Sequence, residues 1–436
     1  MSSPNVFDTG LLSPGTVGAD LLVADSAIVA ALVRVEVALV AAAARAGIVP
    51  TDAADAVAAS LNGLGIEAST LASQASVGGN PVIPLVPLLR AEVARHSPDA
   101  AQCVHRGPTS QDVLDTALML VAADAVDQIR RDLAKAAARV GEMADRHRGT
   151  VMVGRTLTQH ATPTTFGAVA AQWALALADA VVALDRVRGE LPVQLGGASG
   201  TLASFVALGG SDAAARLPQL LAEELGLAAV PTWHVRRTPV TRLGNALVEA
   251  VDAAAFIGSQ VAVLARPEIA EVAEGTGGGS STMPQKQNPV ASILLRSLGQ
   301  RAPGLAAELH RSAALAVDQR PDGAWHAEWP ALRELLRLAL GAGDRVVALV
   351  VGLQVDSDRM AHTLADAGPA ILSERVSLVA GSDAAAELIA AAQSGRVPDV
   401  DPALLDPAGY LGLAEQLVDQ ALAAVAALDI AGEASR

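Results

Sequence analysis

The sequence has a single cysteine, Cys103, which excludes an internal disulfide and any metal centre built from several cysteines. No two histidines stand four residues apart, so the spacing of a helical zinc site is missing and no metal site is expected. Aromatic residues make up only 2% of the chain, whereas hydrophobic residues make up 51%. A large core must therefore be built from Ala, Leu and Val, which favours closely packed helices.

Long uncharged apolar runs are also lacking. The best stretch, residues 28–44, is interrupted by Arg34 and Glu36, and falls short of the roughly 18 to 20 residues that a membrane span needs. The N-terminal residues have neither the basic nor the apolar region of a signal peptide, which predicts a cytoplasmic protein. The net charge of −15 argues against nucleic acids and anionic membranes as partners.

Lysine is scarce, because only Lys135 and Lys286 occur among 31 basic residues. The neighbours of Lys135 predict a solvated helix face, whereas Lys286 lies in a loop rich in Gly and Ser. The side chain of lysine ends in a compact ammonium group, whereas that of arginine ends in a broad planar guanidinium group. We therefore expect Lys286 to be used for its point charge.

Helical periodicity dominates the chain, and strands do not alternate with helices, so no parallel sheet is expected. The sequence predicts an all-α fold with an elongated central bundle of long helices and smaller helical domains at either end. We place these domains at residues 1–104, 105–353 and 354–436. The predicted helices cover residues 26–46, 51–61, 111–146, 163–190, 242–265 and 289–310.

Three polar loops, at residues 104–112, 154–163 and 275–289, each precede a long predicted helix. Each loop carries a cation, and helix N-termini with free N–H groups suit carboxylates. The cations are Arg106, Arg155 and Lys286. We infer a site for a small polycarboxylate that needs neither a metal nor an organic cofactor.

Ordinary helix capping competes with this interpretation. Thr109 or Ser110 can cap the first helix, Thr162 the second with Pro163 as its first residue, and Asn288 the third. The third loop is harder to explain by capping, because its three consecutive glycines are entropically costly and expose backbone N–H groups. A histidine stands in each of the first two loops, and its residue type fits a structural or a catalytic role.

The third loop also carries the main resemblance. Residues 279–289, Gly-Ser-Ser-Thr-Met-Pro-Gln-Lys-Gln-Asn-Pro, resemble the signature G-S-S-x-M-P-x-K-x-N of the fumarase/aspartase superfamily. Residues 109–112 and 154–163 resemble the other two characteristic regions of that superfamily, in the same order. The resemblance covers residues 75–350, and the ends of the chain match only in helical character.

Finer matches favour one branch of the superfamily. Fumarase-like members carry histidine after Gly-Arg-Thr, where this chain has Leu157, and His160 instead follows Gln159 as in bacterial 3-carboxymuconate cycloisomerases. Four further segments are similar to that branch: residues 79–85, 104–112, 196–201 and 325–329. Residues 233–239 and 317–320 depart from its pattern, and the latter lacks a paired Glu and His, which leaves the substrate in doubt.

The resemblance implies lactonisation of 3-carboxy-cis,cis-muconate to 4-carboxymuconolactone, a step of protocatechuate degradation by the β-ketoadipate route. An adenylosuccinate- or argininosuccinate-type lyase that releases fumarate is the alternative, which Leu157 disfavours. A non-catalytic helical oligomer on the same scaffold is disfavoured by Ser280, Lys286, Asn288 and His160. The resemblance further implies a homotetramer in which three subunits contribute one region each to every site.

Roles for individual residues follow from the loops and the resemblance together. The expected catalytic residues are His160, Ser280 and Lys286, and which of the first two delivers the carbon proton stays open. The expected substrate-binding residues are His105, Arg106, Thr109, Ser110, Arg155, Thr158, Gln159, Ser281, Met283 and Asn288.

Overall fold

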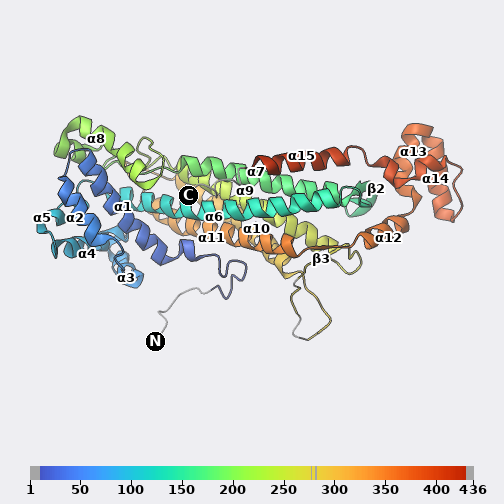
Figure 1. Cartoon of the computed structure of the whole chain (residues 1–436), viewed down its shortest axis with the longest axis horizontal. Coiled ribbons are helices and arrows are strands. Elements are labelled where there is room, and N and C mark those ends of the chain that lie inside the picture. Colours follow the sequence, from blue (N-terminus) through green and yellow to red (C-terminus); the bar gives the residue numbers. More distant parts are fainter. Residues whose placement is uncertain (1–9, 276, 280–281, 429–436) are drawn as a thin grey trace. The chain divides into compact units, whose positions relative to one another are not determined.

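The computed structural model describes residues 10–275, 277–279 and 282–428. Within them the chain is mostly helical, with two antiparallel pairs of short strands, and the predicted all-α fold is confirmed (Figure 1). The helices are α1 (Asp25–Arg45), α2 (Thr51–Leu61), α3 (Ala68–Gly78), α4 (Val82–Ala94), α5 (Pro98–Ala101), α6 (Ser110–Arg146), α7 (Phe166–Glu190), α8 (Ala203–Leu225), α9 (Thr238–Leu264), α10 (Val290–Ala314), α11 (Gly323–Gly352), α12 (Ser357–Ala367), α13 (Ser373–Ala380), α14 (Ser382–Ser394) and α15 (Ala414–Ala427). The strands are β1 (Val151–Thr156), β2 (Gln159–Thr165), β3 (Val272–Ala273) and β4 (Gln354–Val355), and short 3-10 helices are η1 (Leu21–Val23), η2 (Pro369–Leu372), η3 (Pro402–Leu405) and η4 (Pro407–Tyr410).

The described residues form two compact units. The first unit comprises the residues up to 130 together with 183–249 and 300–341, and the second comprises 131–182, 250–299 and the residues from 342 onward. In the first unit, α1 packs against α2 and α8, while α4 packs against α2, α3 and α5. In the second unit, the β1–β2 hairpin packs against α12, and Val376, Ala385 and Leu388 form a small core of their own.

Small residues set the spacing of the long helices. In the second unit, a Cβ atom on Gly258 of α9 would lie 2.9 Å from Leu295 of α10, and one on Gly299 would lie 2.6 Å from Ala255. In the first unit, a Cβ atom on Gly244 would lie 2.7 Å from Leu309. Contacts this short explain how a core poor in aromatic side chains packs densely, because the helix backbones approach closely.

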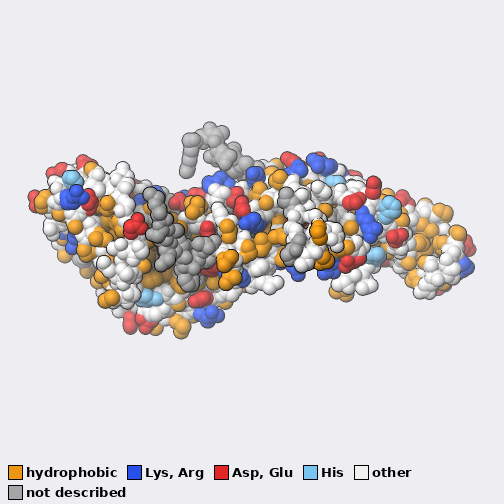
Figure 2. Space-filling view, turned by 90° about the horizontal axis from the view of Figure 1, so that it is seen from below, with side chains coloured by type: hydrophobic (Ala, Val, Ile, Leu, Met, Phe, Trp, Pro, Cys, Tyr) orange, Lys and Arg blue, Asp and Glu red, His pale blue; other side chains and the backbone are white. Residues whose placement is uncertain are grey.

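Three helices, α1, α7 and α9, are long and apolar enough to cross a membrane, judged by length and composition alone. Between 56% and 61% of their most apolar windows is buried inside the protein, so internal packing accounts for much of their apolar character. On the face seen in Figure 2, exposed hydrophobic side chains lie among acidic and basic ones.

Two predicted helix starts are wrong, and the helix expected from residue 242 already begins at Thr238. The helix expected from Pro163 begins at Phe166, because residues 159–165 form strand β2, which pairs with β1. The stretch is rich in threonine, and β-branched residues favour a pleated strand over a helix. The helix is capped by Thr165 and not by Thr162. The hydroxyl oxygen of Thr165 accepts a hydrogen bond from the N–H of Ala168 at 3.0 Å.

Candidate active site

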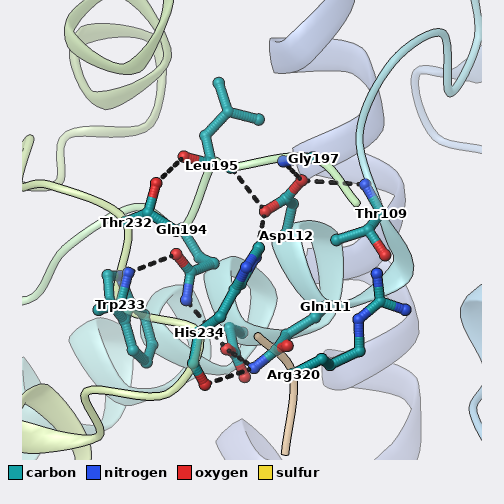
Figure 3. A network of polar contacts seen from close by, with 12 residues as sticks. Thr109, Gln111, Asp112, Gln194, Leu195, Gly197, Thr232, Trp233, His234 and Arg320 are labelled. Atoms are coloured by element: carbon teal, nitrogen blue, oxygen red, sulfur yellow. Dashed lines mark hydrogen bonds and ion pairs between the residues drawn. The ribbon is translucent and has the colours of Figure 1, made fainter. Parts of the chain in front are cut away.

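Asp112 organises the start of α6 (Figure 3). Its buried carboxylate accepts hydrogen bonds from the N–H groups of Thr109, Gly196 and Gly197 at 2.9, 2.8 and 2.9 Å. Nε2 of His234 lies 2.7 Å from its Oδ1. Thr109 occupies the N-cap position, as predicted, because the bond from its N–H to Asp112 is the returning half of a capping box. Asp112 therefore ties the first polar loop to the glycine-rich turn at residues 196–197.

A buried ion-pair cluster lies one helical turn further along α6. The guanidinium of Arg237 donates to both carboxylate oxygens of Asp115, at 2.7 and 3.0 Å, and also binds Glu328. The indole N–H of Trp325 donates to Asp115 at 2.9 Å. Burial opposes the charge of Arg237, but Asp115 and Glu328 outweigh it and raise the pKa of the guanidinium. Burial raises the pKa of Glu328, against the opposing effect of Arg237.

Two glutamines link these carboxylates to the segment around residue 233. The side-chain amide of Gln111 donates to the carbonyl of His234 at 3.0 Å and to Asp115 at 3.2 Å. Gln194 accepts from the N–H of Trp233 at 3.0 Å and donates to Asp115 at 3.3 Å (Figure 3). The sequence interpretation missed this network. The available signal was three polar residues, 111, 112 and 115, with helical spacing at the start of an otherwise apolar helix.

The predicted residues of the first region fall into two groups. Thr109 and His105 are fixed, the former by Asp112 and the latter by Glu36, whose carboxylate lies 2.6 Å from Nδ1 of the imidazole. Arg106 is exposed and Ser110, the first residue of α6, is half-buried. The departing segment at residues 317–320 still brings a cation to this site, because Arg320 donates to the carbonyl of Ala198 at 3.2 Å.

The second region forms the β1–β2 hairpin. Leu157 and Thr158 occupy its two-residue turn with φ of 48° and 68°, a left-handed conformation that costs energy in residues with a side chain. Leu157 is 94% exposed, and Gln159 and His160 are also exposed. The hairpin thus presents His160 on its surface, opposite Arg155 in the strand register.

Arg155 is engaged within the protein. Its guanidinium makes a two-pronged ion pair with the fully buried Glu271, with both N–O distances at 2.8 Å. The pair anchors the hairpin to the residue that precedes β3. Arg155 therefore has a structural role in holding the hairpin, whereas a contact between Arg155 and substrate stays a prediction.

The third region is a loop closed at its neck, which projects beside β3 in Figure 1. Gly278 and Asn288 exchange two backbone hydrogen bonds of 2.9 Å. A Cβ atom on Gly277 would lie 2.5 Å from the amide oxygen of Gln287, so the two sides of the neck approach closely here. Met283 and Lys286 are exposed, and the carbonyl of the former accepts from the N–H of the latter at 3.0 Å.

Ser280 and Ser281 lie outside the described residues. The sequence predicted Asn288 as the cap of the third helix, and this prediction is wrong. Glu274 accepts from the N–H groups of Ala291 and Ser292 and from the hydroxyl of Ser292, at 3.1, 2.9 and 2.6 Å, whereas the amide of Asn288 donates to the carbonyl of Gly279 at 3.3 Å. A charged carboxylate at a helix N-terminus is favoured by the helix dipole, and the folded-back chain brings it there.

Glu274→Ala should lower the free energy of unfolding by about 1 to 2 kcal/mol, because a capping carboxylate and its hydrogen bonds are lost. Urea denaturation at a fixed protein concentration would measure it. Glu268→Ala, at an exposed position of the same segment, is the control and should change little. Equal stability of the two variants would contradict the capping role.

The first region belongs to one compact unit, and the hairpin and the glycine-rich loop belong to the other. Among the described residues, no cluster of three or more His, Cys, Asp or Glu could hold a metal ion.

Comparisons with known proteins place these features in context. A family model described as a lyase matches residues 22–304. The chain is 43% identical to the nitrosuccinate lyase of Streptomyces davaonensis, over 96% of this chain and 95% of that protein. It is 37% identical to the 3-carboxy-cis,cis-muconate cycloisomerase of Pseudomonas aeruginosa, over 89% and 90%. The crystal structure of the 3-carboxy-cis,cis-muconate lactonizing enzyme from Pseudomonas putida gives a TM-score of 0.84 at 33% identity, covering 93% of this chain and 96% of that one.

Proposed function

We propose, since this chain belongs to the lyase family of the fumarase/aspartase superfamily, that it eliminates nitrite from nitrosuccinate to leave fumarate. The observation that carries the proposal is the 43% identity to a nitrosuccinate lyase over 96% of the chain. The departures at residues 233–239 and 317–320 from the cycloisomerase pattern count against lactonisation. A cytoplasmic location is part of the proposal.

The elimination is balanced without an external reagent. A base removes a proton from the carbon next to one carboxylate, the C–N bond breaks, and nitrite leaves with the electron pair. Charge builds on the neighbouring carboxylate as an aci-carboxylate, which preorganised donors and cations stabilise. We assign this stabilisation to Lys286, Asn288 and the N–H groups of Gly277 and Gly279, and the proton transfer to His160 or Ser280.

Lactonisation of 3-carboxy-cis,cis-muconate is the second candidate. The specific observations in its favour are Gln159 and His160 in the second region, Leu157 at the position of the fumarase-like histidine, and the likeness to a lactonizing enzyme in structure. The substrate's own carboxylate is then the nucleophile, and the enzyme supplies orientation, a proton and the same aci-carboxylate stabilisation.

A substrate panel separates these functions. The purified enzyme is offered nitrosuccinate, 3-carboxy-cis,cis-muconate, adenylosuccinate and argininosuccinate in turn. Nitrite and fumarate released in equal amounts support the first proposal, and loss of diene absorbance with lactone formation supports the second. Because nitrosuccinate can decompose unaided, the rate is compared with that of heat-denatured enzyme. Fumarate from adenylosuccinate or argininosuccinate alone would defeat both proposals.

We further propose a homotetramer with composite sites. Members of the superfamily are oligomeric, and the large apolar side chains exposed on the long helices of the second unit would be covered by other subunits. They are Val182, Phe256, Val263, Ile293 and Val351. Exposure of Leu157 beside His160 fits the same arrangement, in which one subunit's hairpin contributes to a neighbour's site.

Mixing an inactive His160→Ala variant with an inactive Ser280→Ala variant should restore part of the activity. Subunit exchange places an intact hairpin and an intact glycine-rich loop in the same site only if sites are shared between subunits. Activity is measured before and after exchange, which native mass spectrometry of the mixed oligomers confirms. Complete exchange with no recovery would count against composite sites.

A further inference from the structure

Glu36 is a buried carboxylate in an apolar helix. It lies on α1 between Val33, Val35, Ala38 and Leu39, all buried, and its own side chain is 0% exposed. Its Oε1 lies 2.6 Å from Nδ1 of His105, and its Oε2 has no hydrogen-bond partner among the described residues. Burying a carboxylate that is only half satisfied lowers stability, and an apolar residue would pack there at no such cost.

The partner of Glu36 is also held in an unfavourable state. His105 has a φ of 54°, in the left-handed region that costs energy for a residue with a side chain. Its imidazole is 17% exposed, and no hydrogen bond to Nε2 is found within the described part of the chain. The pair thus leaves one ring nitrogen available next to Arg106, at the start of the first polar loop.

The loop around His105 is fixed at successive positions. Arg90 donates twice to the carbonyl of Val104, at 3.1 and 3.0 Å, and the hydroxyl of Ser204 donates to the carbonyl of Gly107 at 2.5 Å. A Cβ atom on Gly107 would lie 2.7 Å from the ring of Phe205, so the absence of a side chain lets the loop lie against this ring. Such a loop is preorganised, which is what a group that interacts with developing charge requires.

We propose that Glu36 is a positioning residue that fixes the imidazole of His105 for contact with the substrate. Nδ1–H donates to Glu36, which leaves Nε2 to contact the group that leaves or attacks in the reaction. That group carries negative charge whether it is nitrite or a carboxylate. His105 makes and breaks no covalent bond. The role rests on the proposed function, in either of its two forms, and adds a residue of α1 to the site.

Glu36→Gln tests the proposal, because the amide keeps the size of the side chain but is a weaker, uncharged acceptor for Nδ1–H. We expect kcat to fall by about 10- to 100-fold, with KM changed much less, by analogy with other residues that orient a functional histidine. Glu224→Gln, an exposed carboxylate paired with Arg45 of α1, is the matched control and should leave both constants unchanged.

Two further variants separate positioning from a structural role. Glu36→Met removes the acceptor of Nδ1–H altogether and should lose turnover at least as much as Glu36→Gln, and thermal unfolding of both variants shows whether a loss of fold contributes. The double variant Glu36→Gln/His105→Gln should be no slower than His105→Gln alone, because the two residues act as one unit. A Glu36→Gln enzyme with parental kcat would overturn the proposal.

Failure of the proposed function gives a different result. A parent enzyme that turns over neither nitrosuccinate nor carboxymuconate defeats the proposed function and leaves the orientation of His105 to be tested directly. Histidine labelled with ¹⁵N then reports which ring nitrogen is protonated, with His105→Gln used for assignment. A proton on Nδ1 that is disturbed in Glu36→Gln supports the pairing, and a bare Nδ1 in the parent overturns it.

Discussion

Lys286→Arg should lower turnover by at least about 100-fold, which corresponds to the roughly 2.7 to 4 kcal/mol that one contact to a developing anion contributes. The lysine is exposed within a loop whose neck is closed by Gly278 and Asn288. Its compact ammonium can approach the aci-carboxylate, whereas the broad planar guanidinium of arginine places its charge elsewhere. Lys286→Met removes the charge and should lose as much.

The loss should fall on kcat more than on substrate binding, because the opposing charge develops only during the reaction. Steady-state kinetics with the turned-over substrate measures both constants. Lys135→Arg is the natural control, since the other lysine of the chain is exposed on α6 and should tolerate the change. Near-parental turnover of Lys286→Arg would show that this lysine is a general anion anchor.

Arg237→Met should lower the free energy of unfolding by about 3 to 5 kcal/mol, the typical cost of removing one partner of a buried ion pair. The arginine side chain is 1% exposed and lies between Asp115 and Glu328, which are equally buried. Without the arginine, two negatively charged carboxylates would remain buried with no positive charge to balance them. Chemical denaturation at one fixed subunit concentration is the appropriate measurement, because oligomer stability depends on concentration.

Two controls isolate the charge effect. Arg236→Met changes the neighbouring exposed arginine and should have little effect on stability. The triple variant Arg237→Met/Asp115→Asn/Glu328→Gln should recover part of the loss, because the uncompensated charges are gone. A triple variant as unstable as Arg237→Met would mean that lost packing, and not unpaired charge, causes the effect.

The sequence predicted the helices well where apolar residues recur with helical spacing. The second predicted helix, residues 51–61, has the bounds of α2, and the first differs from α1 by one residue at each end. These segments owe their conformation to local composition and to the burial of one face. The superfamily resemblance could be found from the sequence because the glycine-rich signature is long and continuous, and the match of the lyase family model to residues 22–304 confirms it.

Contacts between distant residues account for what the sequence did not predict. Glu274 caps α10 from across the glycine-rich loop, and Glu36 meets a histidine 69 residues away. The residues next to each carboxylate in the sequence do not indicate which distant residue it contacts. The β1–β2 hairpin was missed for a related reason, since its two-residue turn contains Leu157 and Thr158 in place of the usual Asn-Gly.

The buried ion pairs of Arg237 have a consequence for folding specificity. Helices lined with Ala, Leu and Val present similar surfaces at every turn, so a shift of one turn, about 5.4 Å, would still bury much apolar area. Arg237 joins residues that are 122 and 91 positions away in the chain. A shifted arrangement would strand these charges without partners, and we expect the cluster to select one alignment of the helices over its neighbours.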